Sequence, residues 1–169
     1  MQNPNLNNGG TLCTVSVALS AGTTTTYTTD VATAGFIDGK FVTALAAQTN
    51  TASPTTDANT GTTFVAQGGG ADTGRTVGTI CVYVAGQTAA GAIAVCQGSI
   101  ENLADIADTV NVAPAFPSLP DDFMPFSYVL ITNGNGGTAW TFGASNWTAT
   151  DVTDVYVPIA NLPDRPQTS

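Results

Sequence analysis

Turn-forming residues divide this chain into short segments, and that division limits what it can fold into. Asp38-Gly39 lies between two apolar runs, and this pair is typical of a tight hairpin because both turn residues need positive φ. Further clusters rich in Gly, Asn, Ser, Thr or Pro indicate loops at residues 50–61, 67–74, 86–91 and 133–137. About eight to ten short strands with at most one helix predict an all-β fold, a single antiparallel β-sandwich or barrel with the jelly roll as leading architecture.

The polar residues that the chain uses support this prediction. Only 9% of the residues are charged, against about 25% in ordinary soluble domains. Hydroxyl and amide side chains replace the missing charges, and Thr fills six of the seven positions from 23 to 29. Thr is β-branched and fits the half-buried surface of a strand. The 43% of apolar residues and the length of 169 are sufficient for one core in one domain.

Four segments predict particular strands. Residues 12–19 alternate between polar and apolar side chains, which predicts one half-buried strand. Residues 77–84 are nearly all apolar, which predicts a strand covered on both faces. Residues 126–131 predict a core strand, and we expect an aromatic strand at Trp140 and Phe142 to close a hairpin with it.

The remaining segments define the organisation of the domain. We expect a flexible N-terminal arm over residues 1–10, a single β domain over 11–157 and an extended tail over 158–169. Residues 99–108 have helical spacing after a potential cap, so a short helix is an alternative to strand there. Residues 113–125 contain four prolines and predict an extended connector that crosses between sheets.

The charge balance excludes two classes of partner. Twelve acids and three bases give a net charge of −9, and the only cations are Lys40, Arg75 and Arg165. Three scattered cations cannot form the basic patch that nucleic acids require, and an anionic membrane surface would repel the chain. The first ten residues lack the basic region of a secretory signal, and no stretch approaches the roughly 18 apolar residues of a membrane span.

The three cysteines, Cys13, Cys81 and Cys96, form an odd set without metal-binding spacing. We expect all three to be small buried residues of a protein that stays in a reducing compartment. A disulfide between Cys81 and Cys96 across a hairpin is the alternative.

The inventory of reactive side chains argues against an enzyme. The chain has no His, so the commonest general base and metal ligand is absent. Glu101 is the sole glutamate, and the aspartates lie in turns and loops rather than flanking a cleft. Calcium is the metal most compatible with such a chain, but short acidic pairs are more often solvated turns, so we expect no metal and no cofactor. The acidic pairs are Asp105 with Asp108, Asp121 with Asp122, and Asp151 with Asp154.

Trp140, Phe142 and Trp147 lie close together in the sequence. Core filling is the commoner use of such rings in a small β domain, and we favour it. The alternative is an exposed face on which sugars stack.

Parts of the C-terminal half resemble small virion structural proteins of tailed bacteriophages. The similar segments are Pro114 to Phe126, Trp140 to Trp147 and Leu162 to Pro166, with weaker similarity at residues 37–40 and 54–61. The resemblance implies a capsid decoration or cement protein, present in many copies and bound outside the major capsid protein. It implies no catalytic residues, and it favours strand over helix for residues 99–103.

We therefore expect a virion protein, assembled in the host bacterial cytoplasm, that stabilises the capsid shell from outside. Its expected partners are the major capsid protein and further copies of itself, as a homodimer or homotrimer. An acidic protein is repelled by packaged DNA, which favours the outer face of the shell. Arg165, Pro163 and Trp147 are the candidate assembly contacts. The alternative function is a host-recognition module of head-fibre or tail-fibre type that binds a cell-surface glycan.

Overall fold

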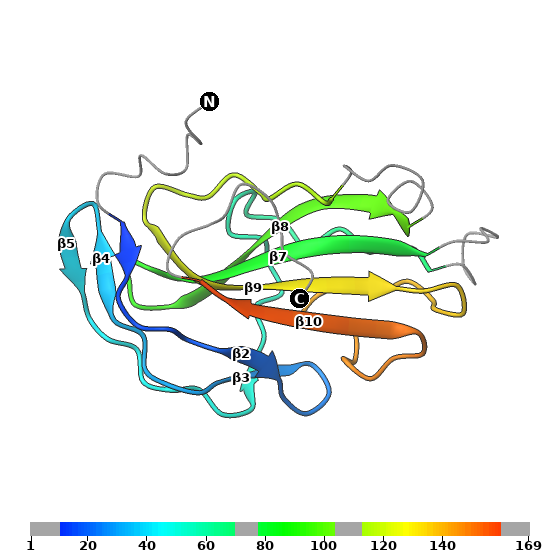
Figure 1. Ribbon diagram of the computed structural model, residues 1–169, viewed down its shortest axis with the longest axis horizontal. Coiled ribbons are helices and arrows are strands. Elements are labelled where there is room, and N and C mark those ends of the chain that lie inside the picture. Colours follow the sequence, from blue (N-terminus) through cyan, green and yellow to red (C-terminus); the bar gives the residue numbers. More distant parts are fainter. Residues whose placement is uncertain (1–10, 70–77, 104–112, 160–169) are drawn as a thin grey trace.

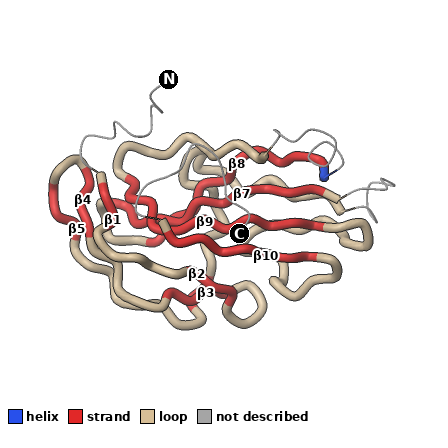
Figure 2. Tube along the Cα trace, in the orientation of Figure 1, coloured by secondary structure: helices blue, strands red, loops and turns tan. Residues whose placement is uncertain are grey.

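The computed structural model describes residues 11–69, 78–103 and 113–159 (Figure 1). The ten strands form three antiparallel sheets, and Leu103 is the only described residue in helical conformation (Figure 2). The prediction of an all-β, antiparallel fold is confirmed. The three sheets stay open in the described part of the chain and do not close into a barrel.

The large sheet contains four strands in the order β10-β9-β7-β8. They are β7 (Thr79–Thr88), β8 (Ile93–Asn102), β9 (Phe123–Asn133) and β10 (Val152–Pro158). Every residue of β7 except Thr88 is buried, which confirms the prediction of a strand covered on both faces. The long strands β7, β8 and β9 run side by side through the middle of the molecule (Figure 1).

Alternation along β7 divides the core into two layers. Cys81, Tyr83 and Ala85 belong to the cluster on one face, and Val82 and Val84 belong to the cluster on the other. The first cluster is covered by the small sheets and by the segments around Phe64 and Trp140. The second is covered by side chains of the segment before β9.

The same alternation explains the state of the cysteines. Cys81 lies in the first cluster and Cys96 in the second, so the sheet separates their thiols. All three cysteines are free and buried, as expected, and the alternative disulfide is not formed.

The first small sheet has the order β1-β4-β5 and lies at one end of the molecule (Figure 1). Its strands are β1 (Leu12–Cys13), β4 (Gly35–Ile37) and β5 (Lys40–Val42). Asp38 and Gly39 connect β4 to β5 with φ values of 51° and 72°. The predicted hairpin is therefore confirmed.

The second small sheet has the order β2-β3-β6. Its strands are β2 (Leu19–Ala21), β3 (Thr26–Thr29) and β6 (Thr51–Ala52). The prediction of one strand over residues 12–19 is wrong, because β1 pairs with β4 and β2 pairs with β3. The chain passes from one sheet to the other between them. Cys13, Val17 and Leu19 are buried as the alternation predicted, but Val15, the fourth residue of that apolar set, is exposed.

The predicted hairpin between residues 126–131 and an aromatic strand is also wrong. β10, and not the segment of Trp140, pairs with β9, from Ser127 to Asn133. Trp140 makes only an isolated bridge with Gln67, and the residues after it form turns. The rings of Trp140 and Phe142 enter the core, which a turn achieves as well as a strand does.

The proline-rich segment before β9 does not cross between sheets, because β8 and β9 belong to the same sheet. It lies beside β8, where the amide of Ser99 donates to the carbonyl of Ala115 at 3.1 Å. β9 begins at Phe123, before the expected start at residue 126, and its register with β7 shifts where Pro125 lies opposite Gly86. A bulge there suits a residue without an N–H donor.

β8 continues as strand through Asn102, so the helical alternative is wrong for residues 99–102, and residues 104–112 lie outside the described part. The expected arm over residues 1–10 also lies outside it, as does most of the expected tail. β10 includes Pro158, the first residue of that tail, and the amide of Ile159 donates to the carbonyl of Phe126 at 2.9 Å.

Candidate functional site

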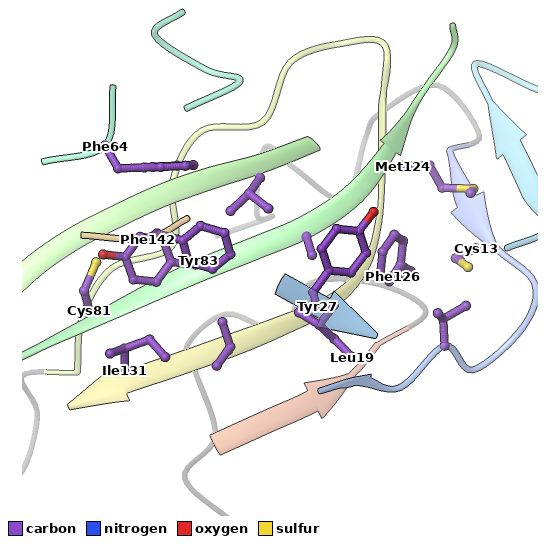
Figure 3. Packing of buried hydrophobic residues seen from close by; sticks show 14 of the residues in the cluster. Cys13, Leu19, Tyr27, Phe64, Cys81, Tyr83, Met124, Phe126, Ile131 and Phe142 are labelled. Carbon is purple, nitrogen blue, oxygen red and sulfur yellow. The ribbon is translucent and has the colours of Figure 1, made fainter. Parts of the chain in front are cut away.

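The aromatic residues that suggested a sugar-binding face are buried. Trp140 and Trp147 are 1% and 4% exposed, and their ring centroids lie 5.5 Å apart. The ring centroids of Phe142 and Tyr83 lie 4.9 Å apart, and the ring of Phe64 lies 5.2 Å from Phe142 and 5.9 Å from Tyr83 (Figure 3). Core filling is therefore confirmed as the role of these rings in the folded chain.

Of the three candidate assembly contacts, Trp147 lies among the described residues. The indole nitrogen of Trp147 donates to the carbonyl of Thr26 at 2.7 Å, so this ring holds β3 against the core. Arg165 and Pro163 lie outside the described part of the chain. Their role in assembly stays a prediction.

Tyr83 forms the centre of a buried polar cluster that the sequence did not indicate. Its hydroxyl accepts from the side-chain amides of Gln67 at 3.1 Å and Gln97 at 3.2 Å. Gln97 also bonds both backbone groups of Val65, each at 2.8 Å, as a neighbouring strand would. Burial raises the pKa of Tyr83 well above its usual range, so the phenol stays protonated and the cluster ties the segment of Gln67 to the sheet.

The thiols are in environments that suppress reactivity. Burial raises the pKa of Cys81 to about 12 and that of Cys96 to about 12, the latter with a contribution from the charge of Asp57. Burial also raises the pKa of Cys13. Nucleophilic cysteines need the opposite shift, because the thiolate is the reactive form.

The described acidic side chains do not gather. Among the described residues there is no group of three or more Cys, Asp or Glu that could hold a metal ion. Asp151, which forms one of the acidic pairs with Asp154, closes a turn by accepting from the amide of Gly136 at 2.6 Å. Asp121 and Asp122 occupy an exposed turn before β9, and the pair Asp105 and Asp108 lies outside the described residues.

One hollow of about 300 Å³ opens beside β8. It is lined by Asp57, Val65, Gln97, Gly98 and Ile100. The carboxylate of Asp57 accepts from the amide of Asn59 at 2.9 Å, which occupies one of its oxygens in a local turn. The volume is at the lower limit of ligand pockets, and Asp57 is the one ionisable group among the described lining residues. These residues do not assemble the acid and base of an active site.

The strongest surface feature is a row of apolar side chains across the small sheet β1-β4-β5. Leu12 lies opposite Phe36, and Phe36 lies opposite Phe41, so the three residues share one face. They are 38%, 37% and 66% exposed, and the two phenylalanine rings meet edge to face at 5.7 Å. We call Leu12, Phe36 and Phe41 the apolar row.

The other face of the same sheet is also apolar. Cys13, Ile37 and Val42 point into the core and are buried. A sheet that covers a core on one side normally presents polar side chains on the other. The sequence contained this signal, because Phe36-Ile37 and Phe41-Val42 place apolar residues on both faces of the hairpin.

Comparison with known proteins adds no relative: no family model, no curated protein and no solved structure matches this chain. Within the described ranges, no helix is long and apolar enough to cross a membrane.

Proposed function

We propose that this chain is a virion structural protein, a capsid decoration or cement protein. It binds the outer surface of the shell formed by the major capsid protein and stabilises it. The observation that carries the proposal is the apolar row, since apolar side chains exposed side by side on a folded domain mark surfaces that contact other proteins.

The aromatic rings and thiols that could bind a ligand or react are buried in the core, which supports a structural role. The clustered tryptophans fill the core, Tyr83 is held by two glutamines, and the thiols are buried. The net charge of −9 favours a position outside the shell, away from packaged DNA. A surface with few charges suits broad contacts, because burying it desolvates few ions.

The proposal includes the partners and the location that the sequence predicted. The protein acts in the virion, after assembly in the host bacterial cytoplasm, with the major capsid protein and with copies of itself. It acts without nucleic acid, membrane, cofactor or catalysis. We further propose that the sheets belong to a sandwich of jelly-roll type, which is supported by two small sheets that pack over one face of a large antiparallel sheet.

Binding to shells tests the function directly. Purified protein is mixed with shells of the same virus that lack it, and the shells are sedimented. We expect saturable binding at a fixed ratio to the major capsid protein and a higher temperature of shell disruption. Binding of only a few copies per shell, or none, would contradict the proposal.

A charge-matched pair of variants tests the predicted tail contact. Arg165→Ser removes the cation from the proline-rich end, and Arg75→Ser removes the same charge elsewhere. We expect Arg165→Ser to weaken shell binding about tenfold and Arg75→Ser to leave it unchanged, in line with one charge-assisted hydrogen bond. Equal effects of the two variants would show that only net charge matters.

A further inference from the structure

The apolar row ends at an open sheet edge. β5 pairs with β4 on one side, and within the described residues no strand pairs with it on the other. Phe41 is the middle residue of β5 and is 66% exposed, the highest value among the large apolar side chains of the described chain. An edge strand with an exposed aromatic residue is a template for pairing with another strand.

The register determines where the backbone groups of Phe41 point. The amide of Thr14 donates to the carbonyl of Ala34 at 2.8 Å, so the backbone of Ala34 faces β1. Alternation along β4 then turns the N–H and C=O of Phe36 toward β1 as well. They are not directed at β5, so Phe36 and Phe41 form a non-hydrogen-bonded pair. The N–H and C=O of Phe41 therefore point outward from the open edge.

Phe41 thus offers one donor and one acceptor beside an exposed ring. Two identical residues of this kind can face each other across a two-fold axis and exchange both hydrogen bonds. The apolar row of one copy then continues into the row of the other, because the side chains of paired residues lie on the same face of a sheet.

The charges near the edge also suit a second copy. The protein carries a net charge of −9, so two copies repel each other over most of their surfaces. At the hairpin tip, Asp38 and Lys40 offset each other, and Lys40 is the one cation among the described residues. Repulsion between two copies is therefore reduced at this end.

We propose that β5 is a self-association edge, at which a second copy of this chain pairs antiparallel with the first around a two-fold axis at Phe41. The product is a dimer with a six-stranded sheet, β1-β4-β5 from each copy, and a continuous apolar face of six side chains. The dimer is the unit that binds the shell, and only this last statement rests on the proposed function.

The structure also limits the pairing to a discrete dimer. The carbonyl of Thr43, the next group that alternation turns toward the open edge, already accepts from Nε2 of Gln87 at 2.7 Å. Lys40 adjoins Phe41 on its other side, and a charged residue opposes longer pairing at an edge. A contact of this width is at the small end of specific interfaces, so we expect dissociation in the range of roughly 1–100 μM.

Sedimentation equilibrium tests the dimer with a matched control. The wild type is expected to shift from 17.0 kDa toward twice that mass as its concentration rises through this range. Phe41→Thr keeps a residue suited to strands and is expected to weaken the dimer about tenfold or more. Val65→Thr changes an apolar residue that is 65% exposed elsewhere and is expected to leave the mass curve unchanged.

Hydrogen exchange of the wild type provides a second readout that needs no variant. The amide of Phe41 is expected to exchange more slowly as concentration rises, while the amides of the edge strand β10 do not change. A wild type that stays monomeric or forms a trimer would overturn the proposal. So would a Val65→Thr variant that dimerises more weakly than the wild type, or protection from exchange that is centred on another surface.

The two proposals fail in different ways. A protein that stays monomeric alone but saturates shells would overturn the dimer and leave the decoration role standing. A protein that dimerises through Phe41 but never sediments with shells would leave the dimer standing and overturn the role.

Discussion

The large sheet and the small sheet β1-β4-β5 differ in how they use their faces. β7 and β9 are ten and eleven residues long, and nearly all their side chains are buried on both faces. β1, β4 and β5 have two or three residues each, and only one face of their sheet is buried. Stability of the domain therefore depends on the large sheet, and the small sheet is available for contact.

The two regions are nevertheless firmly connected. Gln87 at the end of β7 is fully buried, accepts from the hydroxyl of Thr33 and donates to the carbonyl of Thr43. Gly35 of β4 lies so close to β9 that an added Cβ would collide with Sδ of Met124 and the carbonyl of Leu12. An exposed apolar face thus stays in a defined position because its strands are held from behind.

The largest expected effect of a substitution lies in the core on the large sheet. Trp140→Ala removes a ring that contacts Tyr83, Phe142 and Trp147, and should lower the free energy of unfolding by about 3–5 kcal/mol. Urea denaturation measures this loss. Val31→Ala, at an exposed apolar position, serves as the control and should change stability by less than about 0.5 kcal/mol.

The connection between the regions should have the next largest effect. Gln87→Leu removes the acceptor for the Thr33 hydroxyl, which keeps its hydrogen bond from the amide of Leu45, and the side-chain donor to the carbonyl of Thr43. It should cost about 2–3 kcal/mol. Amide exchange should accelerate in β4 and β5 more than in β9. Gln48→Leu, where the side chain donates to the carbonyl of Ala46 and accepts from the hydroxyl of Thr51, both within three residues, should cost less than about 1 kcal/mol. Equal costs at the two glutamines would contradict a connecting role for Gln87.

Alkaline pH should weaken the large sheet through its thiols. Burial in the folded state raises the pKa of the Cys96 thiol to about 12. The protonated thiol therefore makes its full contribution to stability at any pH below the ordinary thiol pKa. Above it, the unfolded chain loses the proton first, and stability falls by about 1.4 kcal/mol per pH unit toward pH 12.

Urea denaturation between pH 7 and 10 measures this slope. Cys96→Ala should reduce the loss of unfolding free energy between pH 7 and 10 by about 1–2 kcal/mol. The smaller side chain also lowers stability, but by the same amount at every pH. Cys13→Ala, in the small sheet, should reduce it less. A slope that is the same in the wild type and in Cys96→Ala would contradict the assignment to this thiol.

The smallest expected effect is at the apolar row. Phe41→Thr should change the unfolding free energy of the monomer by about 0.5 kcal/mol or less, because its ring is mostly exposed. Denaturation at a concentration well below that of dimer formation measures the monomer alone. A loss of several kcal/mol would show that this end of the molecule also carries stability, and the contrast between the regions would fail.

Local chemistry made some elements predictable. The Asp38-Gly39 hairpin depends on two residues that accept positive φ, and the structure has it where expected. The long apolar run of β7 implied burial on both faces, and no distant contact was needed to infer it. Both predictions used information contained within about ten residues.

Other elements depended on partners far away in the chain. Gln67, in a segment expected to be an exposed loop, is fully buried because Tyr83 and Trp140 pack around it. The segment of Trp140 forms turns because β10 occupies the edge of β9 that a strand there would need. No pattern within the segment of Trp140 or within β10 indicates which of the two pairs with β9.

For the candidate surface, the sequence by itself determined that Phe36 and Phe41 flank a tight turn and that apolar residues occupy both faces of their hairpin. Only the tertiary structure decided which of these faces is buried. Packing within the core cluster covers Ile37 and Val42, and the register with β1 adds Leu12 to the exposed side. The physical reason is that alternation distributes side chains between two faces, whereas burial of one face depends on what the rest of the chain brings against it.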